Sequence, residues 1–299
     1  MRRMRWLVCG LAIIGMTPQT RAADLSDTFL RGSQTFQVGE GPRWGGFYAG
    51  AHASYSMGSA DFGKGVSSLV NFALRNSVLQ DQVSSWTTLS KAETTSSGFG
   101  GFIGYNWQWD EAVFGLEGNY TKTQLLMSSS DSLSRAILNN AAAPVGHDHT
   151  YNITVSGNAT VELTDVATFR MRGGWDAGRF MPYAFAGIAV GRANVSRSAT
   201  VSGTLTDNFT IQQTVTDAAG QTIVINIPQS ITSTLVLPGT QVDAQNGVFA
   251  YGWTLGLGVD FCLMQNLFLR AEWEWVQFAA IRDMNVHTNT VRAAVAMKF

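Results

Sequence analysis

The sequence predicts an all-β protein, an eight-stranded antiparallel transmembrane β-barrel of the up-and-down type with long extracellular loops. First, apolar and polar residues alternate with a period of two in several segments, which places each kind on its own face of a β-strand. Second, glycine is abundant (31 residues), proline is scarce (6), and only 14% of residues are charged. Third, no segment after the first 22 residues has the apolar length of a transmembrane helix. A sheet that crosses a bilayer must close on itself, because only then do all its backbone N–H and C=O groups pair within the protein.

Residues 1–22 have the pattern of an export signal. Arginines precede an apolar run, Trp6–Met16, and small residues in Thr20–Ala22 stand where a signal peptidase cleaves. The apolar run is too short to cross a membrane as a helix. We therefore expect a cleaved signal peptide, a periplasmic lead-in at residues 23–45, and a barrel at residues 46–299.

The charge and cysteine content limit the classes of partner and of stabilising bond. Cleavage after Ala22 would reduce Lys+Arg from 20 to 16 against 21 Asp+Glu, a formal net charge of −5. An acidic chain of this kind is not expected to bind nucleic acid. Because Cys9 lies in the signal, Cys262 would be the single remaining thiol, which excludes a disulfide within one molecule.

The first three strands are expected at residues 46–57, 98–109 and 112–121. In each, aromatic and aliphatic residues dominate one parity and polar or small residues the other, where Tyr48 is an exception. This is the pattern of a barrel with a lipid-facing exterior and a polar interior. Asp110-Glu111 is a short turn between the second and third strands. His52 falls on the inward parity, where we expect a neutral, hydrogen-bonded side chain rather than a ligand.

The fourth and fifth strands are expected at residues 168–175 and 181–191, joined by a turn. The fourth, TFRMRGGW, places Arg170 and Arg172 on the inward parity. The fifth, MPYAFAGIAVG, is apolar on both parities, so its facing stays open. Pro182 stands near its start, where a missing backbone N–H is best tolerated.

The last three strands are expected at residues 249–260, 267–275 and 290–299. Their outward parities are aromatic or aliphatic, and the last strand ends on Phe299. Short turns follow the second, fourth and sixth strands. The longest connections, at about residues 58–97, 124–165 and 192–247, all lie on the other side. Short periplasmic turns opposite long external loops are typical of outer-membrane barrels.

The inward parities carry four acidic and four basic residues. They are Glu117, Asp260, Glu272, Glu274, Arg170, Arg172, Arg270 and Arg292. Unpaired charges inside a barrel are costly, whereas hydrogen-bonded arginine–carboxylate pairs are tolerated. Eight strands leave an interior that side chains can fill. We therefore predict a structural ion-pair network, which argues against a wide pore and against a catalytic role.

The long connections have patterns of their own. Apolar residues at helical spacing predict short helices within Val66–Val78 and Leu133–Ile137. Residues 199–236 are rich in Thr, Val and Ile around a turn at 217–220, which predicts that strands five and six extend outward as a hairpin. Such an edge could bind a partner by strand addition or act as an adhesin, although it could also be an ordinary variable loop.

His147-Asp148-His149 is the one sequence that suggests a metal. Two histidines at i and i+2 can share one face of a strand, but a zinc site needs three or four ligands and no others stand nearby. We interpret the segment as a solvated polar loop. No metal, cofactor or catalytic residue is therefore expected.

Five segments resemble one known family. They are WGGFYAGAHASYSMG, GFGGFIGYNWQWDEAVFGLEGNYT, FRMRGGWDAGRFMPYAFAGIAVG, YGWTLGLGVDF with LRAEWEW, and VRAAVAMKF. In order and spacing they are similar to the alphaproteobacterial outer-membrane surface-antigen family (immunogenic, porin-like proteins) of small OmpA-type barrels. The resemblance implies an eight-stranded barrel with antigenic loops and without catalytic residues. It also implies that the barrel-assembly machinery reads Phe299. The sequence departs from the family in its long third loop and in Trp273 and Trp275, where tyrosine is more usual.

The expected function follows from these observations. We expect a non-enzymatic surface protein of the cell outer membrane that contributes to envelope integrity and surface interactions. The alternatives are a narrow porin for small solutes or ions and, more distantly, a lipid-modifying enzyme of the same membrane. The expected partners are outer-membrane lipid and lipopolysaccharide, the barrel-assembly machinery, and a surface ligand bound through the loops.

Overall fold

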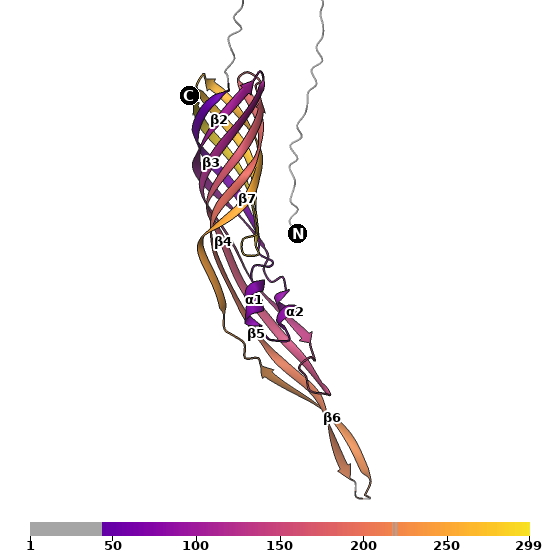
Figure 1. Cartoon of the computed structure of the whole chain (residues 1–299). Helices are drawn as coiled ribbons and strands as arrows, with labels where there is room; N and C mark the ends of the chain where they lie inside the picture. The colour runs from indigo at the N-terminus through magenta and orange to yellow at the C-terminus, as the bar shows by residue number, and fades with distance from the viewer. Residues whose placement is uncertain (1–43, 217, 219) are drawn as a thin grey trace, which may run out of the picture. The chain divides into compact units, whose positions relative to one another are not determined.

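The computed structural model describes residues 44–216, 218 and 220–299 (Figure 1). The predicted signal peptide, residues 1–22, and residues 23–43 of the predicted lead-in lie outside the described residues. Among the residues described, no helix has both the length and the apolar character needed to cross a membrane.

Eight strands form a closed antiparallel ring, in the order β1-β2-β3-β4-β5-β7-β8-β9, and β9 pairs back onto β1. Their bounds are β1 Gly46–Asp61, β2 Lys91–Trp109, β3 Ala112–Leu138, β4 His147–Trp175, β5 Phe180–Thr216, β7 Gln241–Met264, β8 Leu267–Phe278 and β9 Asn285–Lys298. A further strand, β6 (Thr222–Thr234), pairs with β5. The prediction of an all-β, eight-stranded up-and-down barrel is confirmed.

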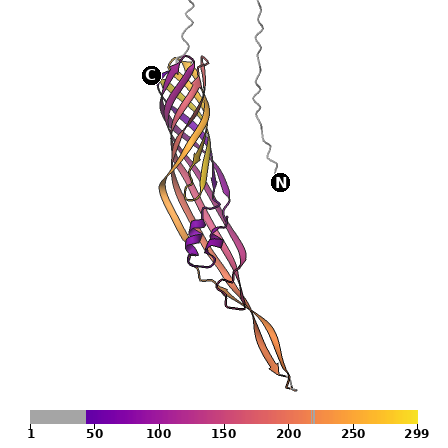
Figure 2. The ribbon, with the colours of Figure 1, turned by 45° about the vertical axis from the view of Figure 1, so that its right-hand side comes forward.

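Three strands continue far beyond the ring (Figures 1 and 2). The connections predicted at residues 124–165 and 192–247 are largely not irregular loops, because β3 runs on to Leu138, β4 begins at His147 and β5 runs on to Thr216. The long connection predicted at residues 58–97 agrees better with the structure. It holds two short helices between the end of β1 and the start of β2.

The helix predicted at Leu133–Ile137 was wrong. This segment belongs to β3, and Ile137 lies opposite Tyr151 of β4. A spacing of four residues places Leu133 and Ile137 on the same face of a strand as well as of a helix, so their spacing could not separate the two structures.

The helices predicted within Val66–Val78 are confirmed in part. Helix α1 spans Ser67–Ala73, and a second helix, α2, spans Gln80–Ser84. Asn76, with a φ of 65°, lies in the turn between them. The outward hairpin is also confirmed, since Thr204–Thr216 pairs with Thr222–Thr234. Its second strand is β6, a separate element, rather than the start of the next ring strand, because β7 begins only at Gln241.

Three neighbouring pairings change register at one level of the sheet. The shifts fall between Lys122 and Leu125, between Leu163 and Asp165, and between Ala193 and Val195. We call residues 62–90, 125–163 and 195–245, on the side away from the short turns, the distal extension. The part of the ring on the side of the short turns is called the barrel. Irregularities of this kind are frequent at barrel rims.

The distal extension has an ordinary hydrophobic core. Helices α1 and α2 contribute Val66, Val70, Leu74, Leu79 and Val83, and the strands contribute Leu125, Met127, Ile153, Val155, Val161, Leu163, Val195 and Val201. The opposite faces of these strands carry mostly serine, threonine and asparagine. This part therefore resembles a water-soluble fold, in which alternation places apolar residues inside.

Candidate functional site

The eight charged residues predicted to face the lumen are all buried, with at most 4% of each residue exposed. Strand pairing places several of them opposite one another. Glu117 lies across from Arg170, Asp260 across from Arg270, and Glu272 across from Arg292. Because each member stands on the inward parity of its strand, the pairing brings opposite charges together at the centre of the ring.

Glu117 is the most connected carboxylate of this network. Arg170 Nε donates to its Oε1 at 2.8 Å, and Arg270 Nη1 donates to its Oε2 at 2.6 Å. Arg172 Nη1 lies 3.4 Å from the same Oε2, and the Tyr48 hydroxyl donates to it at 2.7 Å. Three guanidinium groups thus converge on one buried carboxylate, and charge-assisted bonds of this kind are the strong ones.

The other three carboxylates are also held by arginines. Asp260 accepts bonds from Arg270 Nε at 2.7 Å and from Arg172 Nη2 at 2.6 Å. Glu272 accepts from Arg170 Nη2 at 2.8 Å and from the Tyr183 hydroxyl at 2.5 Å. Glu274 pairs with Arg292 and accepts a bond from Thr254 Oγ1 at 2.9 Å.

Aromatic rings fill the space between the arginines. The guanidinium carbon of Arg172 lies 3.8 Å from the ring centroid of Tyr183, and that of Arg170 lies 4.2 Å from the ring of Phe185. Arg270 lies 4.3 Å from the ring of Phe102. Such cation–π contacts stabilise desolvated cations. They also fill the cross-section with side chains, as expected for eight strands.

These aromatic partners were not among the predicted site residues. Tyr183 and Phe185 belong to the fifth segment, whose facing stayed open because both parities are apolar, and Phe102 stands among the glycines of β2. The signal was present in one respect: Tyr48 and Phe102 stand on the same parity as inward polar residues. An aromatic residue on the polar, inward face of a strand is thus a candidate for packing on a lumen arginine.

The carboxylates of the network are all held by guanidinium groups. Each of its carboxylates is engaged by at least one guanidinium, so none is placed as an available general base. Over the described residues, no group of three or more His, Cys, Asp or Glu side chains could hold a metal ion. The arrangement can fix the ring's cross-section and exclude water from it.

His147 and His149 lie at the start of β4, so the prediction of a loop there was wrong. Both rings approach Asp207 of β5: His147 Nδ1 is 2.9 Å and His149 Nε2 is 3.7 Å from its carboxylate. His147 also stacks on Phe209, with ring centroids 4.5 Å apart. The pairing of β4 with β5 explains this contact, since His147 lies opposite Phe209 and His149 opposite Asp207.

The outer wall of the barrel is apolar. Its exposed large side chains include Phe47, Ile103, Leu116, Phe169, Met171, Ile188, Leu255, Leu257, Leu269, Val291 and Val295. Exposed aromatic residues gather toward both ends of this belt, with Trp107, Trp109, Trp175 and Phe180 near the short turns and Tyr55, Phe99, Tyr120, Phe249 and Tyr251 near the distal extension. Phe299 continues the wall beside β1, where its backbone N–H donates to Phe47 O at 2.8 Å.

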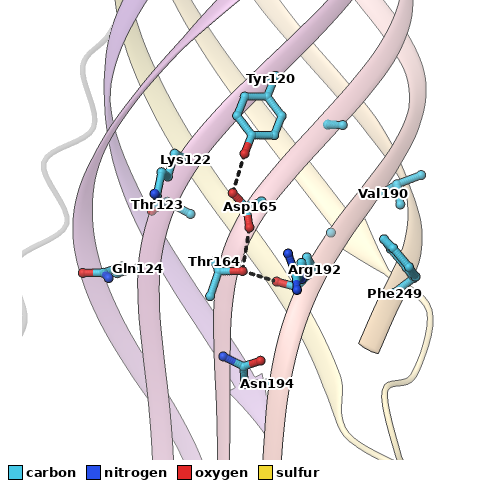
Figure 3. A pocket seen from close by; sticks show the side chains of 12 residues that line it. Tyr120, Lys122, Thr123, Gln124, Thr164, Asp165, Val190, Arg192, Asn194 and Phe249 are labelled. Atoms are coloured by element: carbon cyan, nitrogen blue, oxygen red, sulfur yellow. Dashed lines mark hydrogen bonds between the residues drawn. The ribbon is translucent and has the colours of Figure 1, made fainter. Parts of the chain in front are cut away.

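A pocket of about 680 Å³ lies on the outer wall at the level of the register shifts (Figure 3). We call it the rim pocket. It is lined by Tyr120, Lys122, Thr123, Gln124, Thr164, Asp165, Ala167, Val190, Gly191, Arg192, Asn194 and Phe249. The sequence did not predict it, because its residues come from four strands and meet only through the ring.

Asp165 occupies the middle of the rim pocket. The Tyr120 hydroxyl donates to its Oδ1 at 2.5 Å and the Thr164 hydroxyl lies 2.8 Å from its Oδ2. The bond from Tyr120 lowers the pKa of the Asp165 carboxyl, and the charges of Lys122 and Arg192 lower it further. Asp165 is therefore ionised at neutral pH, with both oxygens already engaged.

No protein-family profile and no curated protein matches the chain. Among solved structures, Neisserial surface protein A has 14% identity and a TM-score of 0.33, covering 85% of this chain and 97% of that one. The attachment invasion locus protein Ail of Yersinia pestis has 9% identity and a TM-score of 0.28, covering 84% and 99%. The translocator domain of the autotransporter NalP from Neisseria meningitidis has 10% identity and a TM-score of 0.25, covering 85% and 88%. These scores are low, and the barrel assignment rests on the chain's own strand pairing.

Proposed function

We propose that this chain is a non-enzymatic β-barrel surface protein of the Gram-negative outer membrane, related to the surface-antigen family that its strand motifs resemble. The observation that carries the proposal is the apolar wall around a closed ring. Phe99, Met171 and Leu257, for example, are 68%, 66% and 59% exposed. A continuous apolar surface of this extent is an aggregation hazard in water, whereas it is the required surface in a bilayer.

The ring also meets the backbone requirement of a lipid environment. All eight strands pair on both sides, so the barrel presents no open sheet edge to the hydrocarbon. The buried network supports a role in envelope integrity rather than in transport, because arginine–carboxylate pairs and aromatic rings occupy the lumen. A ring with a filled lumen has no wide water path.

The distal hairpin of β5 and β6 supports a role in surface interactions. It exposes the aliphatic residues Ile211, Val215, Ile223, Val224, Ile225 and Ile231. Within the described residues, β6 pairs on one side only, with β5. An exposed apolar strand with an unpaired edge is suited to strand addition by a partner. Its Pro228 cannot donate a backbone hydrogen bond, which limits the length that a partner strand can pair with.

A narrow porin is the second candidate, and one observation favours it. A small cavity lies beside the network, lined by polar residues that include Thr121, Glu274 and Arg292 and by the aliphatic residues Leu125, Leu163, Val166 and Val276. If the Glu274–Arg292 pair rearranged, this space would be the natural start of an ion path. The lipid-modifying enzyme remains a distant alternative, because the titratable groups of the lumen are already engaged with one another.

The deciding experiment is single-channel conductance of the refolded mature chain in planar bilayers. Heat-modifiable gel migration of the same sample first verifies that the barrel has formed. We expect a folded barrel that inserts and does not conduct. Stable conductance from a verified barrel would replace the proposal with the porin, and failure to insert into bilayers would contradict the membrane assignment itself.

The assembly role of Phe299 is a separate part of the proposal. Its exposed ring at the end of the last ring strand is available to the barrel-assembly machinery, as the family resemblance implies. Deletion of Phe299 should therefore reduce the folded outer-membrane fraction in cells, while the purified variant still refolds in detergent. A normal outer-membrane level of the truncated chain would contradict this role.

A further inference from the structure

We propose that the rim pocket and the apolar hollow beside it form one binding site for a phosphorylated glycolipid of the lipopolysaccharide class. In this site, Lys122 and Arg192 bind the phosphate, and the hollow holds one acyl chain. This binding site rests on the proposed membrane location of the barrel. It specifies the class of lipid that the outer wall of the barrel binds.

The rim pocket carries a net positive charge. Lys122 and Arg192 both line it, and Asp165 lies between their strands (Figure 3). Within the described part of the chain, neither cation has a carboxylate at ion-pair distance. The Asp165 oxygens accept from the hydroxyl groups of Tyr120 and Thr164, at 2.5 and 2.8 Å. Two cations without an ion-pair partner, beside one carboxylate, favour an anion, and a phosphate offers acceptors to both.

Uncharged polar groups surround the two cations. Gln124, Thr164 and Asn194 line the pocket on its distal side, and the aromatic rings of Tyr120 and Phe249 stand at its apolar edge. Amide and hydroxyl groups match the hydroxyls of a sugar, and exposed rings at the edge of a belt are suited to an amphipathic headgroup. A headgroup that carries both phosphate and sugar fits this lining better than phosphate alone.

The hollow is a pocket of about 620 Å³ on the apolar wall, next to the rim pocket. The two pockets share Tyr120, Ala167 and Val190, so they form one continuous depression. Its floor is made of small outward residues, Gly101, Gly118 and Ala167, and its sides include Ile103, Phe169 and Ile188. A Cβ atom added at Gly118 would meet no atom within 4 Å. The hollow therefore has room for an acyl chain against the wall.

The site lies where a lipid headgroup would lie. The register shifts of β3, β4 and β5 mark the level at which the outer face changes from apolar to polar. The rim pocket spans this level and the hollow lies on its apolar side. The site also lies at the end of the barrel opposite the short turns. In an outer-membrane barrel this end faces the cell exterior. In the outer membrane, phosphorylated glycolipids are found in the outer leaflet, on the side of the cell exterior. The position of the site therefore favours a phosphorylated glycolipid over a phospholipid.

The test uses the refolded full-length mature chain in detergent micelles, with bound lipid counted by native mass spectrometry. The probes are purified lipid A, its deacylated headgroup and phosphatidylglycerol. The headgroup variant is Lys122→Gln combined with Arg192→Gln, and its matched control is Arg179→Gln, a cation of the opposite, short-turn end. The hollow variant is Gly118→Leu, and its control is Gly173→Leu, an outward glycine of β4 that lines neither pocket.

We expect the wild-type barrel to bind lipid A more tightly than phosphatidylglycerol. The headgroup variant should raise the Kd for lipid A about tenfold or more, because it removes both charge-assisted bonds to the phosphate. Gly118→Leu should weaken lipid A binding while leaving the deacylated headgroup unaffected. Both controls should bind as wild type does.

Three results would overturn the inference. One is wild-type affinity for lipid A in both variants. Another is equal affinity of the wild type for lipid A and phosphatidylglycerol, which would indicate an ordinary lipid annulus. The third is an equal loss in the variants and their controls. Heat-modifiable migration of each sample separates these results from a failure of the proposed function, since a barrel that forms and inserts but does not select lipid A contradicts the inference alone.

Discussion

The barrel and the distal extension are made from the same strands but place opposite residues inside. In the barrel, β4 turns Arg170 and Arg172 inward and Phe169 and Met171 outward. In the distal extension, the same strand turns Ile153 and Val155 inward, whereas Ser156 and Asn158 face outward. The reversal falls at the register shift between Leu163 and Asp165. One strand can therefore have a lipid-facing part and a water-facing part. Its alternation of apolar and polar residues depends on the medium that surrounds each part as well as on the fold.

The comparison also explains how each region is stabilised. Apolar burial from water stabilises the core of the distal extension. A lipid-facing wall gains little from contact between apolar groups, so the barrel relies on closed backbone pairing and on the ion-paired lumen. Mutations of the same chemical kind should consequently have different effects in the two regions.

The largest effect is expected from breaking the lumen network. Glu117→Ala leaves the guanidinium groups of Arg170 and Arg270 partly unpaired in a buried site, and it should lower the free energy of unfolding by about 3–5 kcal/mol. The measurement is urea unfolding of the refolded barrel, followed by heat-modifiable migration and tryptophan fluorescence. Glu111→Ala, in the exposed β2–β3 turn, is the control. An unchanged unfolding midpoint for Glu117→Ala would mean that the network does not stabilise the ring.

A core truncation in the distal extension should act locally. Ile153 is fully buried in the apolar cluster of this region. Ile153→Ala should therefore lower the free energy of unfolding of the distal extension by about 3 kcal/mol, through lost burial and the cavity left behind. We expect faster proteolysis and hydrogen exchange in the distal extension, with heat-modifiable migration of the barrel unchanged. Asn158→Ala, on the outward face of the same strand, should have a much smaller effect. Loss of the barrel in Ile153→Ala would show that the two regions do not unfold separately.

Two single arginine substitutions test which outer faces contact lipid. Leu257 stands on the apolar wall of β7, where an arginine should cost about 2 kcal/mol or more in a bilayer. Leu257→Arg should therefore reduce insertion of the refolded chain into lipid vesicles, whereas Ser156→Arg on the distal extension should insert normally. Equal insertion of both variants would argue that the wall at Leu257 does not face lipid.

The smallest expected effect is a pH dependence confined to the distal extension. Arg197, buried in the distal extension, donates to Asp243 at 2.5 Å, and this bond lowers the pKa of the Asp243 carboxyl. A lowered folded-state pKa contributes stability that is present above the ordinary carboxyl pKa and is lost as the pH falls through the lowered value. Protease resistance of the distal extension should therefore decline below about pH 4. Asp243→Asn should be less resistant at neutral pH and lack this decline, so identical pH profiles for the two proteins would contradict the assignment.

Much of the barrel could be predicted from alternation alone. The inward charged residues stand on the parity opposite an apolar face, so their direction followed from strand geometry. The fifth segment could not be oriented, because Tyr183 and Phe185 are inward residues that pack on arginine rather than lipid. The alternation of residue types indicates only whether each face of a strand is polar or apolar. An aromatic ring that stacks on a guanidinium counts as apolar, although it belongs to the charged interior.

The distal extension was harder to predict for a different reason. The polarity of the inward and outward faces reverses near Thr164 of β4, so the sequence of this one continuous strand resembles a polar loop followed by a barrel strand. The rim pocket was missed because its residues are brought together by three strand pairings. A usable signal existed in Lys122, Asp165 and Arg192, which are charged residues just beyond the ends of three strands predicted from the sequence.

The inversion along β4 can be measured directly by spin labelling. In the mature chain with Cys262→Ser, single cysteines at Thr154, Ser156, Asn158 and Thr160 probe the distal extension, and cysteines at Ala167, Phe169, Met171 and Gly173 probe the barrel wall. After reconstitution in lipid vesicles, relaxation by oxygen reports lipid exposure and relaxation by a water-soluble nickel chelate reports water exposure. The account predicts high nickel accessibility through Thr160 and high oxygen accessibility from Ala167 onward, with the change at Thr164–Asp165. Uniform water accessibility along all eight positions would contradict it.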